Sequence, residues 1–384
     1  MSRRVAAVTS TRADFGLMRR AFEAIDADPD LELALIVTGT HLSPEHGSTV
    51  EEIRASGLPI AREVPVKLES DSGAGTARTA GRTTAALADA LEATAPDVVM
   101  LLGDRYEMHA AGVAATAIRL PLVHLCGGET TAGAVDQVWR NSLTKMAHRH
   151  LVATSEYADN VRSMGEAAER VEVVGTPGLD AIAALPPADR AALVEALGID
   201  LAAPVAMITF HPPTTLLPGE PAAAEQLEEF LEGLRRVEAT YVITGSNADA
   251  GGAEATAALT SFAAESPERR VEVASLGSER YLQLMGLAQA MAGNSSSGLI
   301  EAASFELPVV NVGSRQRGRI APPNVIAAAA DAGSVEEALR SALDPAFRED
   351  LRGIENPYGD GRTAARVVAA LKALTLGPEL LVKV

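Results

Sequence analysis

The sequence predicts an α/β protein made of two Rossmann-like, doubly wound domains. Short apolar runs alternate with helical patterns along almost the whole chain, which is typical of parallel strands covered by helices on both faces. A proline-marked interval, Thr176–Arg190, divides these runs into two series. At 384 residues the chain is also longer than one hydrophobic core usually supports.

The first series of apolar runs predicts the strands of an N-terminal sheet. These runs are Val5–Val8, Leu33–Val37, Val98–Leu102, Leu122–Leu125, His150–Ala153 and Val171–Val174. The stretch Thr79–Ala93 has the apolar spacing of a helix. Polar segments follow three of the strands, namely Thr9–Gly16, Gly103–Glu107 and His124–Asp136. Because ligands of open parallel sheets bind beyond the carboxyl ends of the strands, these segments are candidates for a site.

The second series predicts a C-terminal sheet of the same kind, with a helix over Ala222–Val237. Its runs are Val205–Phe210, Tyr241–Thr244, Val271–Ala274, Ala288–Ala292 and Val309–Val312. Polar segments again follow the strands, at His211–Thr215, Gly245–Gly252, Gly293–Gly298 and Gly313–Arg319. So many polar strand ends in two domains predict one ligand cleft between them.

Composition and charge exclude several classes of protein. The formal net charge of −18 argues against nucleic acid and acidic membranes as partners, because both require a positive surface. No apolar run reaches the ~18 residues of a membrane span, and the N-terminus is a poor signal peptide. The single cysteine cannot form an internal disulfide. We therefore expect a cytoplasmic protein.

Three arginines follow predicted strand ends and point to an anionic ligand. Arg12, Arg105 and Arg315 lie near helix starts, where the helix dipole is already positive and another cation gains nothing without an anion. Surface salt bridges are the alternative explanation. Asp104, next to Arg105, is open to two interpretations: it begins a capping box that ends at Glu107, or it is catalytic.

The second half contains further candidates, each with a structural alternative. Ser295, Ser296 and Ser297 could bind an anion at a helix start, or simply cap that helix. Glu301 could accept hydrogen bonds from a ribose diol, or lie on a solvated helix face. His211 is either catalytic or structural.

Other patterns indicate no cofactor or metal chemistry. His148 and His150 lie near a helix end, where we expect them to act as cations that cap the helix dipole. Gly73–Arg78 lacks the third glycine of a dinucleotide loop. Without a Walker loop, a nucleophile elbow or zinc-type spacing, the sequence argues against a dehydrogenase, an ATPase, a serine hydrolase and a zinc enzyme.

Taken together, the polar segments resemble one enzyme family. The segments are "TSTRADFG", "GDRYE", "GGETTAGAVDQVWRNSLTKMAH", "FHPPTT", "GSNADAGG", "GNSSSGLIEAASFELPVVNVGSRQRGR" and "NPYGDG". In this order, from about Thr9 to Gly361, they resemble the hydrolysing UDP-N-acetylglucosamine 2-epimerases of sialic-acid-type sugar biosynthesis. The resemblance implies a glycosyltransferase-B-like fold with the active site in the interdomain cleft.

The resemblance also implies domain boundaries. We expect an N-terminal domain over 1–178, a nucleotide-side domain over 179–362, and a C-terminal segment over 363–384. Its helix, Thr363–Leu374, is expected to pack back on the first domain. A homodimer is the assembly that similar enzymes suggest.

The implied reaction begins with elimination of UDP to give a 2-acetamidoglucal. Water then adds so that carbon 2 has the opposite configuration, and the products are UDP and a free sugar such as N-acetylmannosamine. This chemistry implies a UDP-sugar ligand and no cofactor or metal. The alternatives are a glycosyltransferase on the same fold and a non-catalytic protein that binds a UDP-sugar.

The resemblance assigns roles to individual residues. Asp104, Asp136 and His211 correspond to catalytic groups of the family. Glu129 and Cys126 are two further candidates for catalytic residues. The expected substrate or nucleotide contacts are Arg12, Arg105, His124, Ser295, Ser296, Gly298, Glu301 and Arg315.

Cys126 departs from the common family pattern. Many relatives have a glutamate there, as a proposed catalytic base, whereas this chain reads His124-Leu-Cys-Gly-Gly-Glu129. Some relatives that act on 2,4-diacetamido sugars also lack this glutamate and keep Gly-Gly-Glu before a threonine-rich loop. Either Glu129 is the base, or Cys126 acts as a thiolate, or the substrate differs. A neutral thiol that only fills space is the remaining alternative.

Overall fold

The computed structural model describes residues 2–69, 72–130, 135–213, 216, 218–245, 252–273 and 276–383. Parts of three expected site loops lie outside these residues, namely 131–134, 214–215 and 246–251, as does the expected strand end Ala274. The chain forms two compact units. Unit 1 comprises Met1–Ala183 and Tyr358–Val384, and unit 2 comprises Ala184–Pro357.

Unit 1 is built on a parallel sheet. Within the described residues the sheet has seven strands in the order β3-β2-β1-β4-β5-β6-β7. The strands are β1 (Arg3–Thr9), β2 (Leu31–Val37), β3 (Ile60–Glu63), β4 (Val98–Leu102), β5 (Leu122–Leu125), β6 (Arg149–Val152) and β7 (Val171–Val173). The strand order changes direction at β1 and β4; the loop after β1 leads directly into Arg12, and the loop after β4 contains Asp104.

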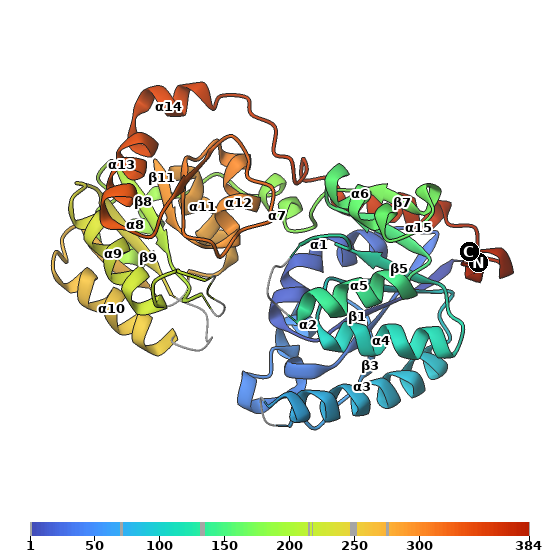
Figure 1. Cartoon of the computed structure of the whole chain (residues 1–384). Coiled ribbons are helices and arrows are strands. Elements are labelled where there is room, and N and C mark those ends of the chain that lie inside the picture. Colours follow the sequence, from blue (N-terminus) through green and yellow to red (C-terminus); the bar gives the residue numbers. More distant parts are fainter. Residues whose placement is uncertain are drawn as a thin grey trace. The chain divides into compact units, whose positions relative to one another are not determined.

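Helices cover both faces of this sheet (Figure 1). They are α1 (Arg12–Ala27), α2 (Val50–Ala55), α3 (Gly73–Thr94), α4 (Tyr106–Ala117), α5 (Asp136–Met146), α6 (Ser155–Ser163), α7 (Leu179–Ala183), α15 (Thr363–Ala373) and α16 (Pro378–Leu381), with 3-10 turns η1 (Gly39–Leu42), η2 (Pro44–His46) and η3 (Ala168–Arg170). One core joins α1 and α15 to one face, and a second core joins α3, α4 and α5 to the other. This two-sided burial explains the continuously apolar strands.

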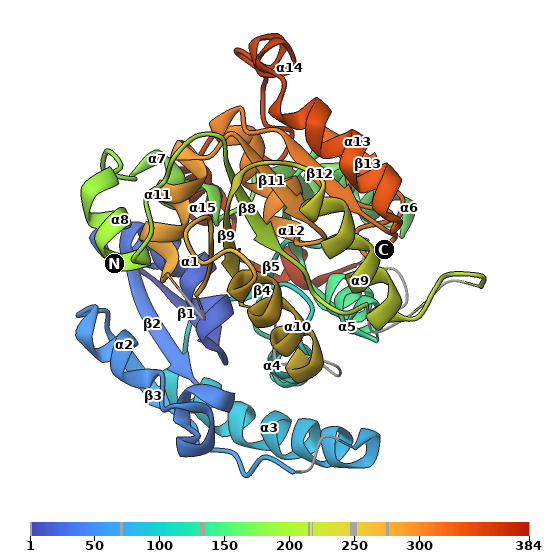
Figure 2. The ribbon, with the colours of Figure 1, turned by 90° about the vertical axis from the view of Figure 1, so that its left-hand side faces the viewer.

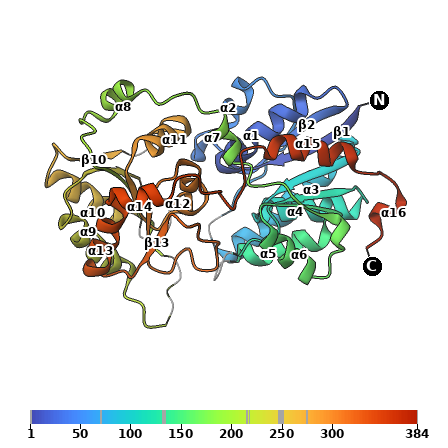
Figure 3. The same cartoon turned by 90° about the horizontal axis from the view of Figure 1, so that it is seen from above.

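The C-terminal helix α15 packs against α1, as Figure 3 shows from above. The Asp180 carboxylate accepts hydrogen bonds from the first amides of α15, Thr363 N at 2.8 Å and Ala364 N at 2.5 Å. The helix start therefore has a carboxylate partner that satisfies amides left free by the helix itself.

Unit 2 repeats the architecture with a second parallel sheet. Within the described residues its six strands run in the order β10-β9-β8-β11-β12-β13. The strands are β8 (Val205–Thr209), β9 (Thr240–Thr244), β10 (Arg270–Val273), β11 (Ala290–Gly293), β12 (Val309–Val312) and β13 (Val325–Ala328). The helices are α8 (Arg190–Leu197), α9 (Ala223–Arg235), α10 (Gly252–Ala264), α11 (Ser278–Leu287), α12 (Ser296–Ile300), α13 (Ala332–Leu343) and α14 (Pro345–Asp350), with the turn η4 (Ala302–Phe305). Helix α13 lies against α9 and against β12 and β13 (Figure 2).

The predicted α/β class is confirmed, with two Rossmann-like parallel sheets. The sequence pattern missed only two of the described strands, β3 and β13, and each lies at one edge of its sheet. Edge strands are partly exposed, so their residues need not form a continuous apolar run. In β3, for example, Arg62 and Glu63 are exposed.

Candidate active site

The loop after β4 brings Asp104 to a buried arginine. Helix α4 begins at Tyr106, its N-cap residue is Arg105, and no side chain caps it. The capping-box interpretation of Asp104 is therefore wrong. Instead, the Asp104 carboxylate accepts a hydrogen bond from Nη2 of Arg140 on α5.

Arg140 pairs with two of the three expected catalytic carboxylates, those of Asp104 and Glu129, and we call these three residues together with Asp136 the Arg140 cluster. Nη1 of Arg140 lies 3.5 Å from the Glu129 carboxylate, and Asp136 is one helical turn earlier on α5. Arg140 is only 4% exposed. Its Nε makes no hydrogen bond to any residue that the structure describes, whereas Nη1 has the Glu129 carboxylate as its neighbour.

The sequence analysis did not single out Arg140. Its spacing from Asp136 was the available signal, because residues four apart share one face of a helix.

Asp136, at the first position of α5, is suited to hold a proton. Burial raises the pKa of this carboxyl, and the nearby Asp104 carboxylate raises it further. The positive charges of Arg105 and Arg140 oppose these effects without cancelling them. A carboxyl in this environment can serve as a general acid.

Cys126 follows β5 with a left-handed backbone, at φ 61°, and is buried. Burial raises the pKa of its thiol well above the ordinary value, and the Glu129 carboxylate adds to the effect. The raised pKa favours a protonated thiol over the alternative of a thiolate base. Gly128 in the same turn, at φ 79°, leaves no room for a side chain, because a Cβ would lie 2.3 Å from the Tyr157 carbonyl oxygen.

His124 is placed to orient the loop after β4, and its expected contact with the substrate stays a prediction. The ring is fully buried in β5. Its Nε2 donates to the Gly103 carbonyl oxygen at 2.8 Å, and its Nδ1 lies 3.2 Å from the Thr144 hydroxyl. Burial lowers its pKa to about 3, so the ring is neutral. The histidine thus fixes the residue before Asp104.

The expectation that His148 and His150 cap a helix as cations is also wrong. Burial lowers the pKa of each ring to about 4, so both are neutral near pH 7. Nδ1 of His148 accepts from Leu122 N at 3.1 Å, and Nε2 of His150 donates to Glu166 at 3.0 Å. The cation at the end of α5 is Lys383, whose Nζ donates to two backbone carbonyl oxygens there.

Arg12 and Arg105 already have acidic neighbours within unit 1. Arg12 is largely exposed and lies 3.2 Å from the Glu52 carboxylate. Arg105 donates from Nε and Nη2 to the buried Glu107 carboxylate at 3.1 and 2.9 Å. Burial alone would lower the pKa of Arg105, but Glu107 and Asp14 outweigh it and the pKa is raised. Both side chains are charged, and a phosphate would compete with these carboxylates for them.

In unit 2, Asn294 joins the loops that contain His211 and Arg315. Its side chain accepts from His211 N at 2.7 Å and donates to the His211 carbonyl oxygen at 2.8 Å. Its own carbonyl oxygen accepts from Arg315 Nη1 at 3.1 Å and from Gln316 Nε2 at 2.8 Å. The loops after β8, β11 and β12 are thereby held together. The sequence analysis did not single out Asn294 because nothing local marks an 83-residue contact.

Ser295 caps the short helix α12, since its side chain accepts from Ser297 N. The Ser297 hydroxyl donates to the Glu301 carboxylate, and the Tyr281 hydroxyl donates to Ser297 at 3.0 Å. Burial raises the pKa of the half-buried Glu301, which disfavours the alternative of a fully solvated helix face. Gly298 lets α12 pack closely on β12, because a Cβ there would lie 2.9 Å from the Val309 side chain.

Two searches of the described residues found nothing. No helix is both long enough and apolar enough to cross a membrane. In the same part of the chain, no group of three or more His, Cys, Asp or Glu residues is arranged to hold a metal ion.

Comparisons with known proteins identify relatives of this chain. Residues 23–372 match the family model described as UDP-N-acetylglucosamine 2-epimerase. A protein from Legionella pneumophila, named UDP-N,N'-diacetylbacillosamine 2-epimerase (hydrolyzing), is 34% identical over 100% of this chain and 99% of its own length. A protein from Campylobacter jejuni, named GDP/UDP-N,N'-diacetylbacillosamine 2-epimerase (hydrolyzing), is 36% identical over 84% of each chain.

Solved structures show the same fold at lower identity. A UDP-N-acetylglucosamine 2-epimerase from Neisseria meningitidis, bound to UDP-N-acetylglucosamine, has a TM-score of 0.75 at 18% identity and covers 96% of this chain and 99% of its own. A complex of S. aureus MnaA with UDP has a TM-score of 0.77 at 17% identity, over 96% of each chain. These likenesses confirm the expected glycosyltransferase-B-like fold class. The chain belongs to the UDP-N-acetylglucosamine 2-epimerase family.

Proposed function

We propose that this protein is a hydrolysing nucleotide-sugar 2-epimerase whose substrate is UDP-N,N'-diacetylbacillosamine. The observation that carries the proposal is the Arg140 cluster, because one buried guanidinium, on the helix that also carries Asp136, pairs with the carboxylates of Asp104 and Glu129. The choice of sugar is supported by the two relatives of 34% and 36% identity that are named for it. The Cys-Gly-Gly-Glu sequence at 126–129 supports it as well.

In the proposed first step, Glu129 removes the proton from carbon 2 of the sugar. The bond between carbon 1 and the diphosphate oxygen breaks, UDP leaves with the electron pair, and a double bond forms between carbons 1 and 2. Glu129 is preferred as the base because the Cys126 thiol is protonated. Arg140 supplies a positive charge beside the developing negative charge.

In the proposed second step, water adds across the double bond. The oxygen of water adds to carbon 1, and a proton reaches carbon 2 from the face opposite to the one that lost it. The proton that water gives up returns to the carboxylate that supplied the proton of carbon 2. Asp136 is the proposed proton donor because its pKa is raised by burial and by Asp104. The product is the free sugar epimerised at carbon 2.

In unit 1, Arg12 and Arg105 are the proposed contacts of the diphosphate, and the following residues are the proposed nucleotide contacts of unit 2. Arg315 is held by Asn294 and would face the diphosphate, with His211 in the neighbouring loop. Glu301 is held by Ser297 and would accept hydrogen bonds from the ribose diol. Ser295 and Ser296 would add hydroxyl contacts.

The test is UDP release from a panel of nucleotide sugars. We expect turnover of UDP-N,N'-diacetylbacillosamine and slower turnover of UDP-N-acetylglucosamine. UDP release that requires an added acceptor sugar would indicate a transferase. Tight UDP binding without turnover of either sugar nucleotide would indicate a binding protein, and both results would contradict the proposal.

A further inference from the structure

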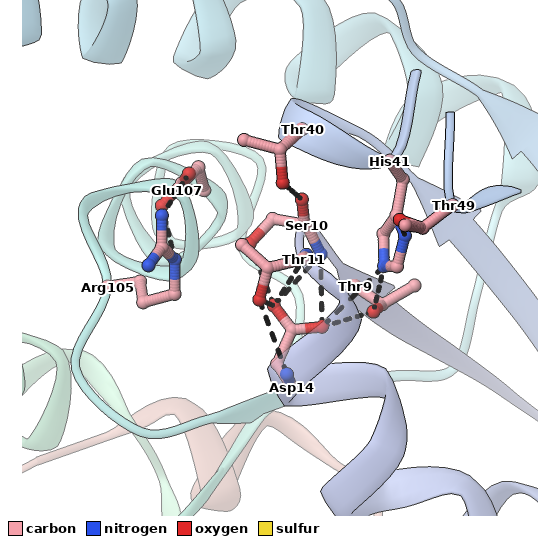
Figure 4. A network of polar contacts seen from close by, with 9 residues as sticks. All are labelled: Thr9, Ser10, Thr11, Asp14, Thr40, His41, Thr49, Arg105 and Glu107. Atoms are coloured by element: carbon pink, nitrogen blue, oxygen red, sulfur yellow. Dashed lines mark hydrogen bonds and ion pairs between the residues drawn. The ribbon is translucent and has the colours of Figure 1, made fainter. Parts of the chain in front are cut away.

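The turn between β1 and α1 is organised by a buried carboxylate, that of Asp14 (Figure 4). It accepts hydrogen bonds from Ser10 N and Thr11 N, each at 3.0 Å, and from the Ser10 hydroxyl at 2.8 Å. The Thr9 hydroxyl donates to its other oxygen. One side chain thus takes up the backbone donors that this turn offers.

These donors are of the kind that bind phosphate in many nucleotide-binding domains. Amides at a helix N-terminus and the positive end of the helix dipole attract an anion. Here the anion is part of the chain. Burial works to raise the pKa of Asp14, but hydrogen bonds from His41, Thr9 and Ser10 outweigh it and the pKa is lowered, so the group is a carboxylate.

The same carboxylate fixes the direction of a hydrogen-bond chain that reaches two other elements. A carboxylate only accepts, so Thr9 donates to Asp14 and its oxygen must accept from Nε2 of His41, 3.0 Å away. Nδ1 of His41 then accepts from the Thr49 hydroxyl at 2.7 Å. Thr49 is the N-cap residue of α2 but makes no side-chain cap bond there, which agrees with this use of its hydroxyl.

The carbonyl group of Ser10 is held by hydrogen bonds as well. Its carbonyl oxygen accepts from Thr40 Oγ1 at 3.1 Å and from His41 N at 3.3 Å. Gly39, at φ 62°, permits this approach, since a Cβ there would lie 2.8 Å from the same oxygen. The loops after β1 and β2 are therefore locked to one another.

We propose that Asp14 is a positioning residue for the substrate site: by accepting from Ser10 N and Thr11 N, its carboxylate holds the turn that leads into Arg12, the first residue of α1. The inference rests on the proposed function, in which Arg12 contacts the diphosphate. Asp14 itself touches no substrate.

The first test is the variant Asp14→Asn. The amide nitrogen of the new side chain would face the donors Ser10 N and Thr11 N. The turn should therefore loosen although the side chain keeps its size. With the variant shown by circular dichroism to be folded, we expect KM for the UDP-sugar to rise about tenfold or more, as for loss of charge-assisted hydrogen bonds. A purely structural role would lower apparent kcat and leave KM unchanged. Asp26→Asn, an exposed site on the same helix, is the control and should match the wild type.

The second test uses formate as a probe for the space that the Asp14 carboxylate leaves when it is removed. In Asp14→Ala, formate should raise the melting temperature and bring KM back toward the wild-type value, whereas wild type and Asp26→Asn should not respond. If formate changes neither quantity and Asp14→Asn keeps the wild-type KM, the inference is wrong. An inactive wild type would overturn the proposed function instead, and the formate-dependent melting temperature would still test Asp14.

Discussion

At the residue scale, Glu129 and Cys126 share one turn but differ in their charged surroundings. The Cys126 thiol is protonated, whereas Glu129 lies beside the Arg140 guanidinium. We expect Glu129→Gln to lower kcat by about 10²–10⁴-fold, the usual contribution of a general base. Cys126→Ala should stay within about threefold of wild type, because a small protonated side chain supplies no charge there. The opposite pattern in steady-state kinetics would make Cys126 the base.

The pKa of Asp136 gives a second residue-scale prediction. Burial and Asp104 raise this pKa, so the acid form persists to higher pH than in an ordinary aspartate. As pH rises through the raised pKa the proton is lost, and kcat should fall on that alkaline side. Asp136→Asn should lower kcat about 100-fold and remove this limb of the pH profile. If kcat of the variant still falls at the same alkaline pH, another group is the acid.

At the element scale, the end of α5 is locked by the C-terminal segment. Lys383 Nζ donates to the carbonyl oxygens of Lys145 and Ala147 at 2.8 and 2.6 Å, and lies 2.8 Å from the Glu166 carboxylate. Because α5 also carries Asp136 and Arg140, this lock supports the helix of the Arg140 cluster. Lys383→Met should lower the melting temperature by about 3 °C, as expected for loss of a favourable charge at a helix end.

The acid sensitivity of this lock follows from its titrating groups. The pKa of Glu166 is lowered to about 2, because hydrogen bonds from Lys145 and Lys383 outweigh burial, and those of His148 and His150 are lowered to about 4 by burial. All three groups bind protons more readily in the unfolded chain, so stability is lost as pH falls from about 6.5 toward 2. In thermal melts, the melting temperature of Glu166→Gln should fall less steeply than that of the wild type below about pH 4.5. An unchanged acid profile would contradict the assignment.

At the scale of the whole molecule, the sequence predicted what burial and local spacing determine. The central strands β4 and β5 were predicted to the residue, because burial on both faces makes them continuously apolar. The edge strands β3 and β13 were missed. Carboxylates at 104 and 136 were found as candidates, but Arg140 and Asn294 were not, because their partners lie 36 and 83 residues away. Such contacts exist only in the folded sheet. Protonation states such as that of Cys126 likewise depend on burial.

The central claim is an epimerisation at carbon 2 through loss and return of a proton. The most direct measurement is NMR of the sugar that the protein releases from UDP-N,N'-diacetylbacillosamine in D₂O. We expect UDP, a free sugar with inverted configuration at carbon 2, and one deuterium at that carbon. A free sugar that keeps its configuration and its original hydrogen at carbon 2 would show simple hydrolysis and would contradict the claim.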